Sequence, residues 1–249
     1  VQHAYSENPV VYILEVNPRA SRTVPFVCKA TGEPLAKIAA RVMVGQSMKS
    51  QGARVEVTPK YMSVKEAVFP FTKFLGVDPV LGPEMRSTGE VMGTGKTFGE
   101  ALYKAELGAG NRLPKTGTAF ISVRDVDKPR AVSVATHLRD QGFQIVATRG
   151  TAATLQHAAI PCKIVNKVSE GRPNVTDMIK NGDLQLVITT SNESRTQISD
   201  ARSIRQTALA QLGVVYYTTI SGAAAAVEGQ KHAGEVEVRS LQELHKLNA

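Results

Sequence analysis

The first apolar run of the chain spans residues 10–14 and leads directly into a polar segment that begins at Glu15. Such a run predicts a buried strand, and because side chains on a strand alternate faces, Glu15 and Asn17 would project from the same side. Pro18 lacks an N–H group, which favours the end of the strand there. A carboxylate, an amide oxygen and the guanidinium of Arg19 would then meet at one strand end. This donor set suits a hard divalent cation and phosphate oxygens; a strand that ends in a plain polar turn is the alternative interpretation.

Helix-like and strand-like patterns follow in the rest of the N-terminal half. Apolar residues recur at helical spacing in one stretch, and in another Thr97 and Gly108 are typical start and stop signals of a helix. The expected elements are helices over residues 31–50 and 97–107 and short strands over residues 55–57 and 67–71.

A stretch rich in glycine and polar residues, 108–117, predicts a boundary between domains over residues 1–110 and 111–249. Beyond it, short β-rich runs alternate with helical patterns, which predicts an α/β fold: a Rossmann-like parallel sheet with helices on both faces. The expected strands are 118–123, 143–148, 163–165, 186–190 and 214–218, and the expected helices are 129–141, 152–159, 175–181 and 197–212.

Polar residues follow the expected strands of this second domain. Parallel sheets bind ligands beyond the carboxyl ends of their strands, close to helix N-termini. Residues 148–151 are expected to form a compact polar turn with Gly150 at its bend. Each hydroxyl or lysine alone has an ordinary explanation, such as a helix cap or a solvated charge. Their recurrence predicts a phosphate pocket that needs no metal, formed by Ser122, Lys128, Thr148, Thr151, Lys167, Thr189 and Ser191.

Composition describes an ordinary globular protein, with 42% hydrophobic and 21% charged residues. The net charge is +8, but only 5% of the residues are aromatic and there is no Trp, so we expect no nucleic-acid partner. No apolar run is long enough to span a bilayer, so no membrane partner is expected either. The two cysteines, Cys28 and Cys162, indicate no disulfide framework or zinc site, and a cytoplasmic location is expected.

One further motif, Gly-Thr-Gly-Lys-Thr at residues 93–97, suggests a P-loop. A Walker A motif needs a glycine where this chain has Glu90. We therefore reject the P-loop and expect Thr97 to be a helix cap.

The segments 20–26 (ASRTVPF), 29–32 (KATG), 61–66 (YMSVKE) and 82–90 (GPEMRSTGE) carry a family resemblance. They resemble the ATP-grasp core of the carbamoyl-phosphate synthase large chain, near its C-terminal end. The resemblance implies that Gln2, Glu15 and Asn17 are ligands of Mg²⁺ or Mn²⁺, that Glu15 belongs to the ATP site, and that Arg19 is catalytic. The chain is expected to be a C-terminal fragment that cannot turn over ATP by itself.

The second domain resembles the methylglyoxal-synthase-like regulatory domain of the same family, which Glu170 to Pro173 also match. The resemblance implies that the pocket binds nucleotide monophosphates, UMP as an inhibitor and IMP as an activator, although Thr189 stands where bacterial relatives often have Asn. True methylglyoxal synthases carry a catalytic Asp in a Gly-Gly-Asp turn. This chain has Gly-Arg-Pro-Asn at residues 171–174, so we expect a sensor.

Ornithine is a further effector of the family, and the matching positions here are Glu66, Tyr216 and Thr218. Two acidic ligands that the family pattern requires would precede Val1, so weak or absent ornithine binding is expected.

For the full-length enzyme, the resemblance implies synthesis of carbamoyl phosphate from bicarbonate, glutamine-derived ammonia and two ATP, by way of carbamate, for pyrimidine and arginine biosynthesis. A glutaminase small chain would be the partner, and self-association through the regulatory domain is expected. The alternatives are a free-standing module that binds nucleotide monophosphates and a lyase of the methylglyoxal synthase type, which the missing Asp disfavours.

Overall fold

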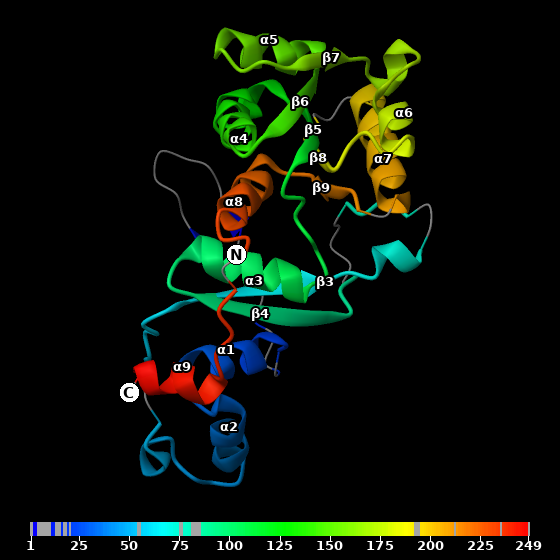
Figure 1. Ribbon diagram of the computed structural model, residues 1–249. Coiled ribbons are helices and arrows are strands. Elements are labelled where there is room, and N and C mark those ends of the chain that lie inside the picture. Colours follow the sequence, from blue (N-terminus) through cyan, green and yellow to red (C-terminus); the bar gives the residue numbers. More distant parts are fainter. Residues whose placement is uncertain are drawn as a thin grey trace. The chain divides into compact units, whose positions relative to one another are not determined.

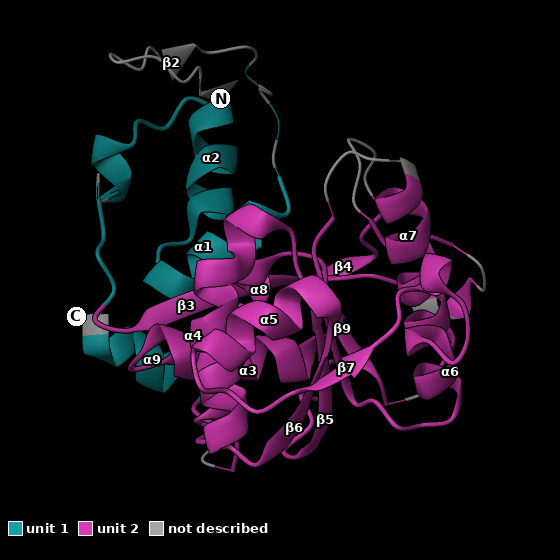
Figure 2. Ribbon diagram, turned by 90° about the horizontal axis from the view of Figure 1, so that it is seen from above, with its two compact units in different colours: residues 1–59, 240–249 teal, residues 60–239 magenta. Residues whose placement is uncertain are grey.

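A computed structural model describes the residues 2–3, 11–12, 16, 19, 21–53, 56–74, 77–80, 86–191, 195–211, 213–234 and 236–248. The chain forms two compact units, coloured separately in Figure 2. Unit 1 comprises residues 1–59 and 240–249, and unit 2 comprises residues 60–239. Unit 2 is therefore inserted, along the sequence, between two parts of unit 1.

Unit 1 is built from short elements. Its elements are strands β1 (Gln2–His3) and β2 (Val11–Tyr12), which pair antiparallel, helices α1 (Thr23–Thr31), α2 (Leu35–Met43) and α9 (Leu241–Asn248), and the 3₁₀ turn η1 (Lys49–Gln51). The last helix packs on α1, where the His245 Nε2 atom bonds the Lys29 carbonyl oxygen at 2.8 Å.

The helix expected over residues 31–50 is shorter in the structure, where α2 ends at Met43 and a separate helix α1 precedes it. Gly32 ends α1 in the left-handed conformation with φ of 83°, and Gly45 follows α2 with φ of 94°. Glycine adopts this conformation without the steric penalty of a Cβ atom, so both helices end early.

Unit 2 begins with an antiparallel hairpin of β3 (Met62–Val68) and β4 (Gly89–Gly95), in register from Met62 opposite Gly95 to Val68 opposite Gly89. Between them lies η2 (Phe71–Lys73), and helix α3 (Phe98–Gly108) packs on the hairpin. The strand expected at 67–71 lies earlier because Pro70 cannot continue a ladder. Residues 56–57 form no strand.

The main sheet contains five parallel strands in the order β7-β6-β5-β8-β9, which confirms the expected α/β fold (Figure 1). The strands are β5 (Gly117–Ser122), β6 (Phe143–Thr148), β7 (Lys163–Val165), β8 (Leu186–Thr189) and β9 (Val215–Tyr217). All five strands match their expected ranges closely, because buried parallel strands are continuous apolar runs bounded by turn residues.

Helices cover both faces of this sheet (Figure 1). Ile121 points into one apolar core with α4 (Lys128–Asp140), α5 (Arg149–His157) and α8 (Ile220–Gln230). Its neighbour Phe120 points into the other core, with α6 (Val175–Lys180) and α7 (Arg195–Ala210). The turns η3 (Asp125–Asp127) and η4 (Val168–Glu170) follow β5 and β7. The expected polar turn at 148–151 is instead the first turn of α5.

The domain boundary expected at residues 108–117 lies within unit 2, because α3 packs against α8. Gly99 and Gly229 allow this close approach: a Cβ atom on Gly99 would lie 3.2 Å from the Glu228 carbonyl oxygen. Packing alone does not test the division into domains 1–110 and 111–249, which stays a prediction. Among the described helices, none is both long and apolar enough to cross a membrane.

Candidate functional site

A polar cavity of about 150 Å³ lies at the carboxyl ends of strands β5, β6 and β8, within unit 2. All seven residues expected to form the phosphate pocket line it: Ser122, Lys128, Thr148, Thr151, Lys167, Thr189 and Ser191. Gly150 and Thr190, from the expected polar segments after β6 and β8, also line it. Sequence reasoning missed the other lining residues, Val123, Arg124, Asp125, Gln197, Asp200, Ala201 and Ile204. The structure therefore brings together side chains from four separate strand ends.

The wall between β5 and β6 is a network of hydroxyl groups. Ser122 Oγ and Thr148 Oγ1 lie 3.0 Å apart, and Thr151 Oγ1 accepts a hydrogen bond from the Val123 N–H at 3.2 Å. Thr148 and Thr151 are 3% and 2% exposed. Thr148 is the N-cap residue of α5, but its hydroxyl bonds Ser122 and makes no cap bond. The N–H groups of the first turn of α5 are thus not capped by Thr148 and can bind an anion.

Positive charge is concentrated beside this helix terminus. Lys128 Nζ lies 3.7 Å from the position that a Cβ atom on Gly150 would take, so the absence of a side chain there lets the cation approach α5. Lys128 Nζ also lies 2.7 Å from Asp125 Oδ1, and this ion pair lowers the pKa of Asp125. A second cation, Arg124, donates from Nε to Asp127 Oδ2 at 2.6 Å.

Lys167 reaches the cavity from the loop after β7. Two hydrogen bonds hold this loop in place. Its N–H donates to Glu170 Oε2 at 2.9 Å. Ser169 Oγ in η4 donates to Asp200 Oδ2 of helix α7 at 2.6 Å. Lys167 thus lines the cavity from a turn that is anchored to α7.

Helix α7 forms the remaining wall and is anchored on its other side. Arg205 donates from Nε and Nη2 to the two carboxylate oxygens of Asp78, both at 2.9 Å. Burial raises the pKa of Asp78, but the hydrogen bonds and charge of Arg205 outweigh it and leave the pKa below its usual value. The Arg205 residue is 5% exposed. This bidentate pair connects α7 to the segment between β3 and β4.

The residues expected to bind ornithine fall into different surroundings. Glu66 of β3 lies near Glu106, and burial and that neighbouring charge raise its pKa. Tyr217 OH donates to Glu106 Oε1 at 3.5 Å, so Tyr217 belongs to this acidic cluster. Tyr216 packs on the α6–α7 core, and burial raises its pKa to about 12. Thr218, just after β9, is half-buried. The structure thus brings Tyr217, and not Tyr216, next to Glu66.

The expected metal and catalytic residues are described only in part. Glu15 and Asn17 lie outside the described residues, and Gln2 belongs to β1 but its side chain is not described. Arg19 is exposed. Among the described residues, no group of three or more His, Cys, Asp or Glu side chains is placed to hold a metal ion. The Mg²⁺ or Mn²⁺ site therefore stays a prediction.

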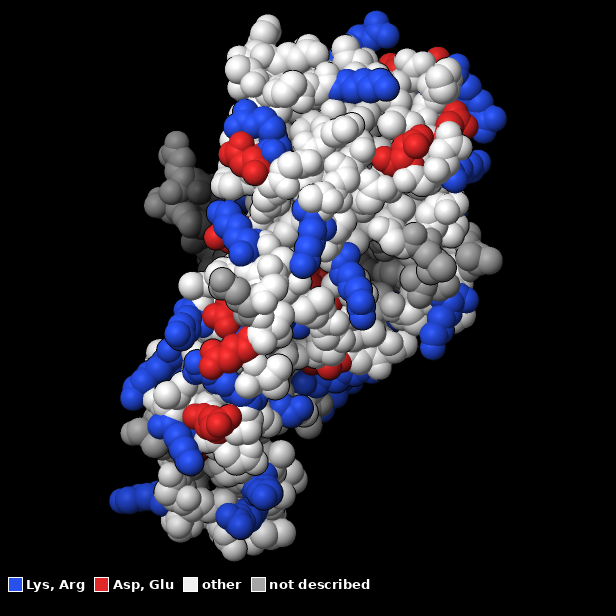
Figure 3. All heavy atoms as spheres, in the orientation of Figure 1, with Lys and Arg blue, Asp and Glu red and all other residues white. Residues whose placement is uncertain are grey.

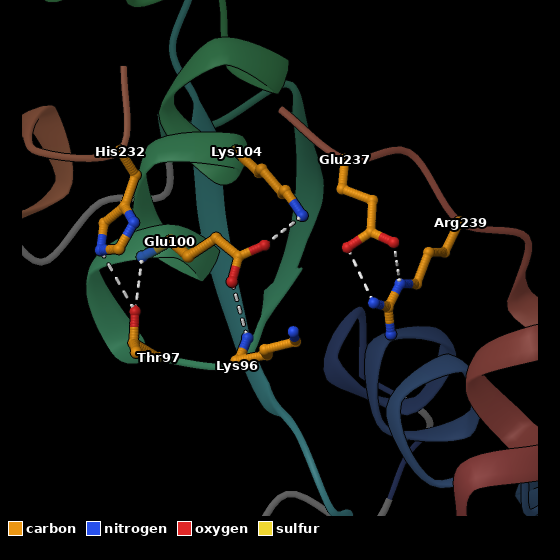
Figure 4. Close-up of polar contacts among 7 residues, drawn as sticks. All are labelled: Lys96, Thr97, Glu100, Lys104, His232, Glu237 and Arg239. Carbon is orange, nitrogen blue, oxygen red and sulfur yellow. Dashed lines mark hydrogen bonds and ion pairs between the residues drawn. The ribbon is translucent and has the colours of Figure 1, made fainter. Parts of the chain in front are cut away.

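The former P-loop candidate is a self-contained helix start (Figure 4). Thr97 Oγ1 accepts from the Glu100 N–H at 3.2 Å, which confirms Thr97 as the cap of α3. Glu100 Oε2 accepts from the Lys96 N–H at 2.8 Å, and its Oε1 pairs with Lys104 Nζ at 2.7 Å. His232 Nε2 lies 3.3 Å from the Thr97 hydroxyl. Because Glu100 and Thr97 bind these backbone donors, the helix start is not arranged as a phosphate cradle.

Two family models match separate parts of the chain. Residues 130–218 match the MGS-like domain, and residues 1–51 match the carbamoyl-phosphate synthase L chain, ATP binding domain. The chain is therefore similar to the carbamoyl phosphate synthase large chain in two separate segments. This similarity confirms the resemblance that the sequence motifs indicated.

Carbamoyl phosphate synthase large chains from several bacteria are similar to nearly the whole chain. That of Ralstonia nicotianae is 64% identical over 236 residues, which are 95% of this chain and 22% of the relative. That of Pasteurella multocida is 56% identical over 99% of this chain and 23% of the relative. That of Xanthomonas campestris pv. campestris is 58% identical over 95% of this chain and 22% of the relative. The chain thus spans somewhat more than a fifth of these relatives.

Proposed function

We propose that the cavity of unit 2 binds a nucleoside monophosphate and that the chain carries the regulatory domain of a carbamoyl phosphate synthase together with part of its carbamate-phosphorylating site. UMP would act as the inhibitor and IMP as the activator. One observation supports this most strongly: hydroxyls and lysines predicted from separate strand ends line a single cavity. If these residues were scattered over the surface, each could be explained as a solvated charge or a helix cap.

The arrangement of the cavity suits a phosphate group. A dianion between Lys128 and the first turn of α5 would accept hydrogen bonds from backbone N–H groups. It would also be stabilised by the helix dipole and by the ammonium group of Lys128. Ser122, Thr148 and Lys167 offer further donors, while Thr189 and Ser191 line the part of the cavity near β8, where a ribose would lie. No metal is required for this mode of binding.

A sensor fits residues 171–174 better than a lyase does. Asn174 is 4% exposed, and its side chain accepts hydrogen bonds from the Thr176 N–H at 3.0 Å and from Thr176 Oγ1 at 2.7 Å. Asn174 is therefore the cap of α6 and offers no carboxylate base for proton abstraction.

For the whole protein we propose ATP-dependent synthesis of carbamoyl phosphate from bicarbonate and glutamine-derived ammonia. Residues 1–51 would supply part of the site that phosphorylates carbamate. There Gln2, Glu15 and Asn17 would offer oxygen ligands to Mg²⁺ or Mn²⁺, and Arg19 would stabilise phosphate charge. The metal would neutralise charge on ATP. A glutaminase small chain, ornithine near Glu66, self-association through the regulatory domain and a cytoplasmic location complete the proposal.

Calorimetric titration of the 249-residue chain with UMP tests the cavity assignment. Lys167→Ala should weaken UMP binding at least about tenfold, because it removes a charge-assisted hydrogen bond from the cavity. Lys163→Ala is the matched control: this lysine is exposed on β7, near Lys167 in sequence, but does not line the cavity. Equal affinities for the wild type and both variants, or no UMP binding at all, would contradict the assignment.

A further inference from the structure

Both cations of the loop after β5 are engaged by aspartates of the same loop. Arg124 pairs with Asp127, and Lys128 pairs with Asp125, so the two pairs interleave across η3. An anionic ligand that enters the cavity therefore meets cations that already have counter-ions. The question is which of the two pairs a ligand can open.

The Arg124–Asp127 pair is fixed in the fold. The Asp127 side chain is only 10% exposed. Burial raises the pKa of Asp127, but hydrogen bonds from Arg124 and Thr190 outweigh it and lower the pKa overall. The Arg124 N–H also donates to Thr190 Oγ1 at 3.0 Å, which ties this residue to the end of β8. Opening this pair would leave a buried carboxylate without its counter-ion, which is strongly unfavourable.

The Lys128–Asp125 pair is different because its two members differ in exposure. The Asp125 side chain is 87% exposed, whereas that of Lys128 is 24% exposed and faces the first turn of α5. Asp125 can turn into water with little loss, since exposed ion pairs contribute little to stability. Lys128 would then keep its position beside Gly150 and remain available to an anion.

We propose that Asp125 is a built-in competitor of the bound anion and sets the affinity of the cavity. In the free protein Asp125 neutralises Lys128. When a phosphate group binds between Lys128 and α5, the ion pair between Asp125 and Lys128 breaks. The Asp125 carboxylate then remains close to the negative charge of the phosphate. Both effects weaken binding, and both are properties of the phosphate end of the site, so they apply to any phosphomonoester. The inference rests on the proposed anion-binding role of the cavity.

The test compares two substitutions that remove the same charge from helix α4 and the turn before it. Asp125→Asn should tighten binding of UMP about three- to tenfold at roughly 0.02 M salt, and the gain should shrink at about 0.5 M salt because the carboxylate is exposed to screening ions. Asp140→Asn is the control, since Asp140 is exposed, pairs with Arg139 and lies about 18 Å away at the other end of α4. Its affinity should stay within about twofold of wild type. Both carboxylates lie in exposed positions, and circular dichroism verifies that the variants fold.

A double-mutant cycle separates competition for Lys128 from a general charge effect. In a Lys128→Ala background the gain from Asp125→Asn should fall to less than about half, because there is no cation left to release. An undiminished gain in that background, or an equal gain in Asp140→Asn, would overturn the proposal.

The outcomes also distinguish this inference from the proposed function. UMP binding that Lys167→Ala weakens but Asp125→Asn leaves unchanged would overturn the role of Asp125 and leave the cavity assignment intact. No UMP binding by the wild type or by Asp125→Asn would overturn both. Inorganic phosphate is a second probe and should show the same ratio of affinities.

Discussion

Unit 2 contains two groups of charged side chains that follow opposite rules. In and behind the wall of the cavity, charges are matched: Asp125 faces Lys128 in the lining, Asp78 faces Arg205 on the outer side of α7, and each cation lowers the pKa of its partner carboxylate. Between β3, α3 and β9, two carboxylates instead lie near one another: Glu106 is 6% exposed, Glu66 is half-buried, and burial together with the charge of Glu106 raises the pKa of Glu66.

The difference between the two groups shows which charged side chains hold elements in place and which oppose folding. Matched charges hold elements in place, as Arg205 does for α7, and leave a cavity in which donors remain for a ligand. The unmatched cluster is held by neutral donors, since Asn111 Nδ2 donates to Glu106 Oε2 at 2.6 Å and Tyr217 to Oε1. Neutral hydrogen bonds offset only part of the penalty of burying a carboxylate. Among the matched charges, the Asp78–Arg205 pair is therefore the one that matters for stability, because Arg205 is buried, and the unmatched group destabilises the fold at neutral pH.

Acidic and basic side chains are interspersed on the face of the molecule that Figure 3 shows. Surface pairs such as Arg139–Asp140 are solvated and contribute little free energy. For the charged groups below, the expected change in the free energy of unfolding therefore depends on how deeply the side chain is buried and not on the presence of an ion pair alone.

The largest effect is expected from Asp78→Ala. It leaves the Arg205 guanidinium, whose side chain is 6% exposed, without its counter-ion, and should lower the free energy of unfolding by about 3 kcal/mol. Urea unfolding followed by circular dichroism measures the loss as a lower midpoint at unchanged slope.

The control for that prediction is Asp140→Ala, which removes an exposed carboxylate and should change stability by less than about 0.5 kcal/mol. Similar small losses in both variants would show that Arg205 finds other partners and that the matched group does not hold α7.

The cavity could be predicted from the sequence because its residues directly follow strands that are recognisable from local sequence patterns. Strands such as β6 are continuous apolar runs, each is followed by Ser, Thr or Lys, and parallel strands align their carboxyl ends at one edge. Strand alternation likewise predicts that Tyr216 and Tyr217 face opposite sides. It does not reveal which side Glu66 occupies, because that depends on how the β3–β4 hairpin packs against the sheet.

Strand β4 was missed for a physical reason. Its glycines weaken every strand signal, yet Gly93 is required by packing, since a Cβ atom there would collide with the Ala101 carbonyl oxygen of α3. The counter-ion Asp125 was missed as well. Its spacing to Lys128 is visible in the sequence, but only the η3 turn brings the two side chains together. Both features depend on tertiary structure.

An intermediate effect is expected where the cavity wall is neutral. Thr151→Val removes the acceptor of the buried Val123 N–H and should cost about 1–2 kcal/mol of stability. It should also weaken UMP binding, because the loop that carries Lys128 follows Val123. Thermal unfolding with and without UMP measures both effects.

Thr154→Val on the same helix is the matched control. The Thr154 hydroxyl donates only to the Gly150 carbonyl oxygen, at 3.4 Å, and does not line the cavity. A loss of stability as large as that of Thr151→Val would assign the effect to helix α5 itself and not to the hydrogen bond across the cavity.

The smallest effect is expected in the unmatched cluster, and it has the opposite sign. Burial raises the pKa of Glu106 above its ordinary value of 4.5, against the hydrogen bonds from Asn111 and Tyr217. A carboxyl whose pKa is raised by folding contributes its stability below about pH 4.5 and loses it as the pH rises through the folded-state value. Glu106→Gln removes that loss and should raise the free energy of unfolding by about 1 kcal/mol at pH 7, with no gain near pH 4.

Two readouts check this prediction. The difference in unfolding free energy between Glu106→Gln and wild type should grow from acidic to neutral pH, and the pKa of Glu66, followed by carboxyl NMR, should fall because its charged neighbour is gone. Glu228→Gln is the control of opposite sign. Lys231 lowers the pKa of Glu228, so this carboxylate stabilises the fold above its unfolded-state pKa, and its removal should give a loss at neutral pH that fades in acid. If Glu106→Gln followed the trend of Glu228→Gln, Glu106 would be a matched charge, and the contrast between the two groups would not hold.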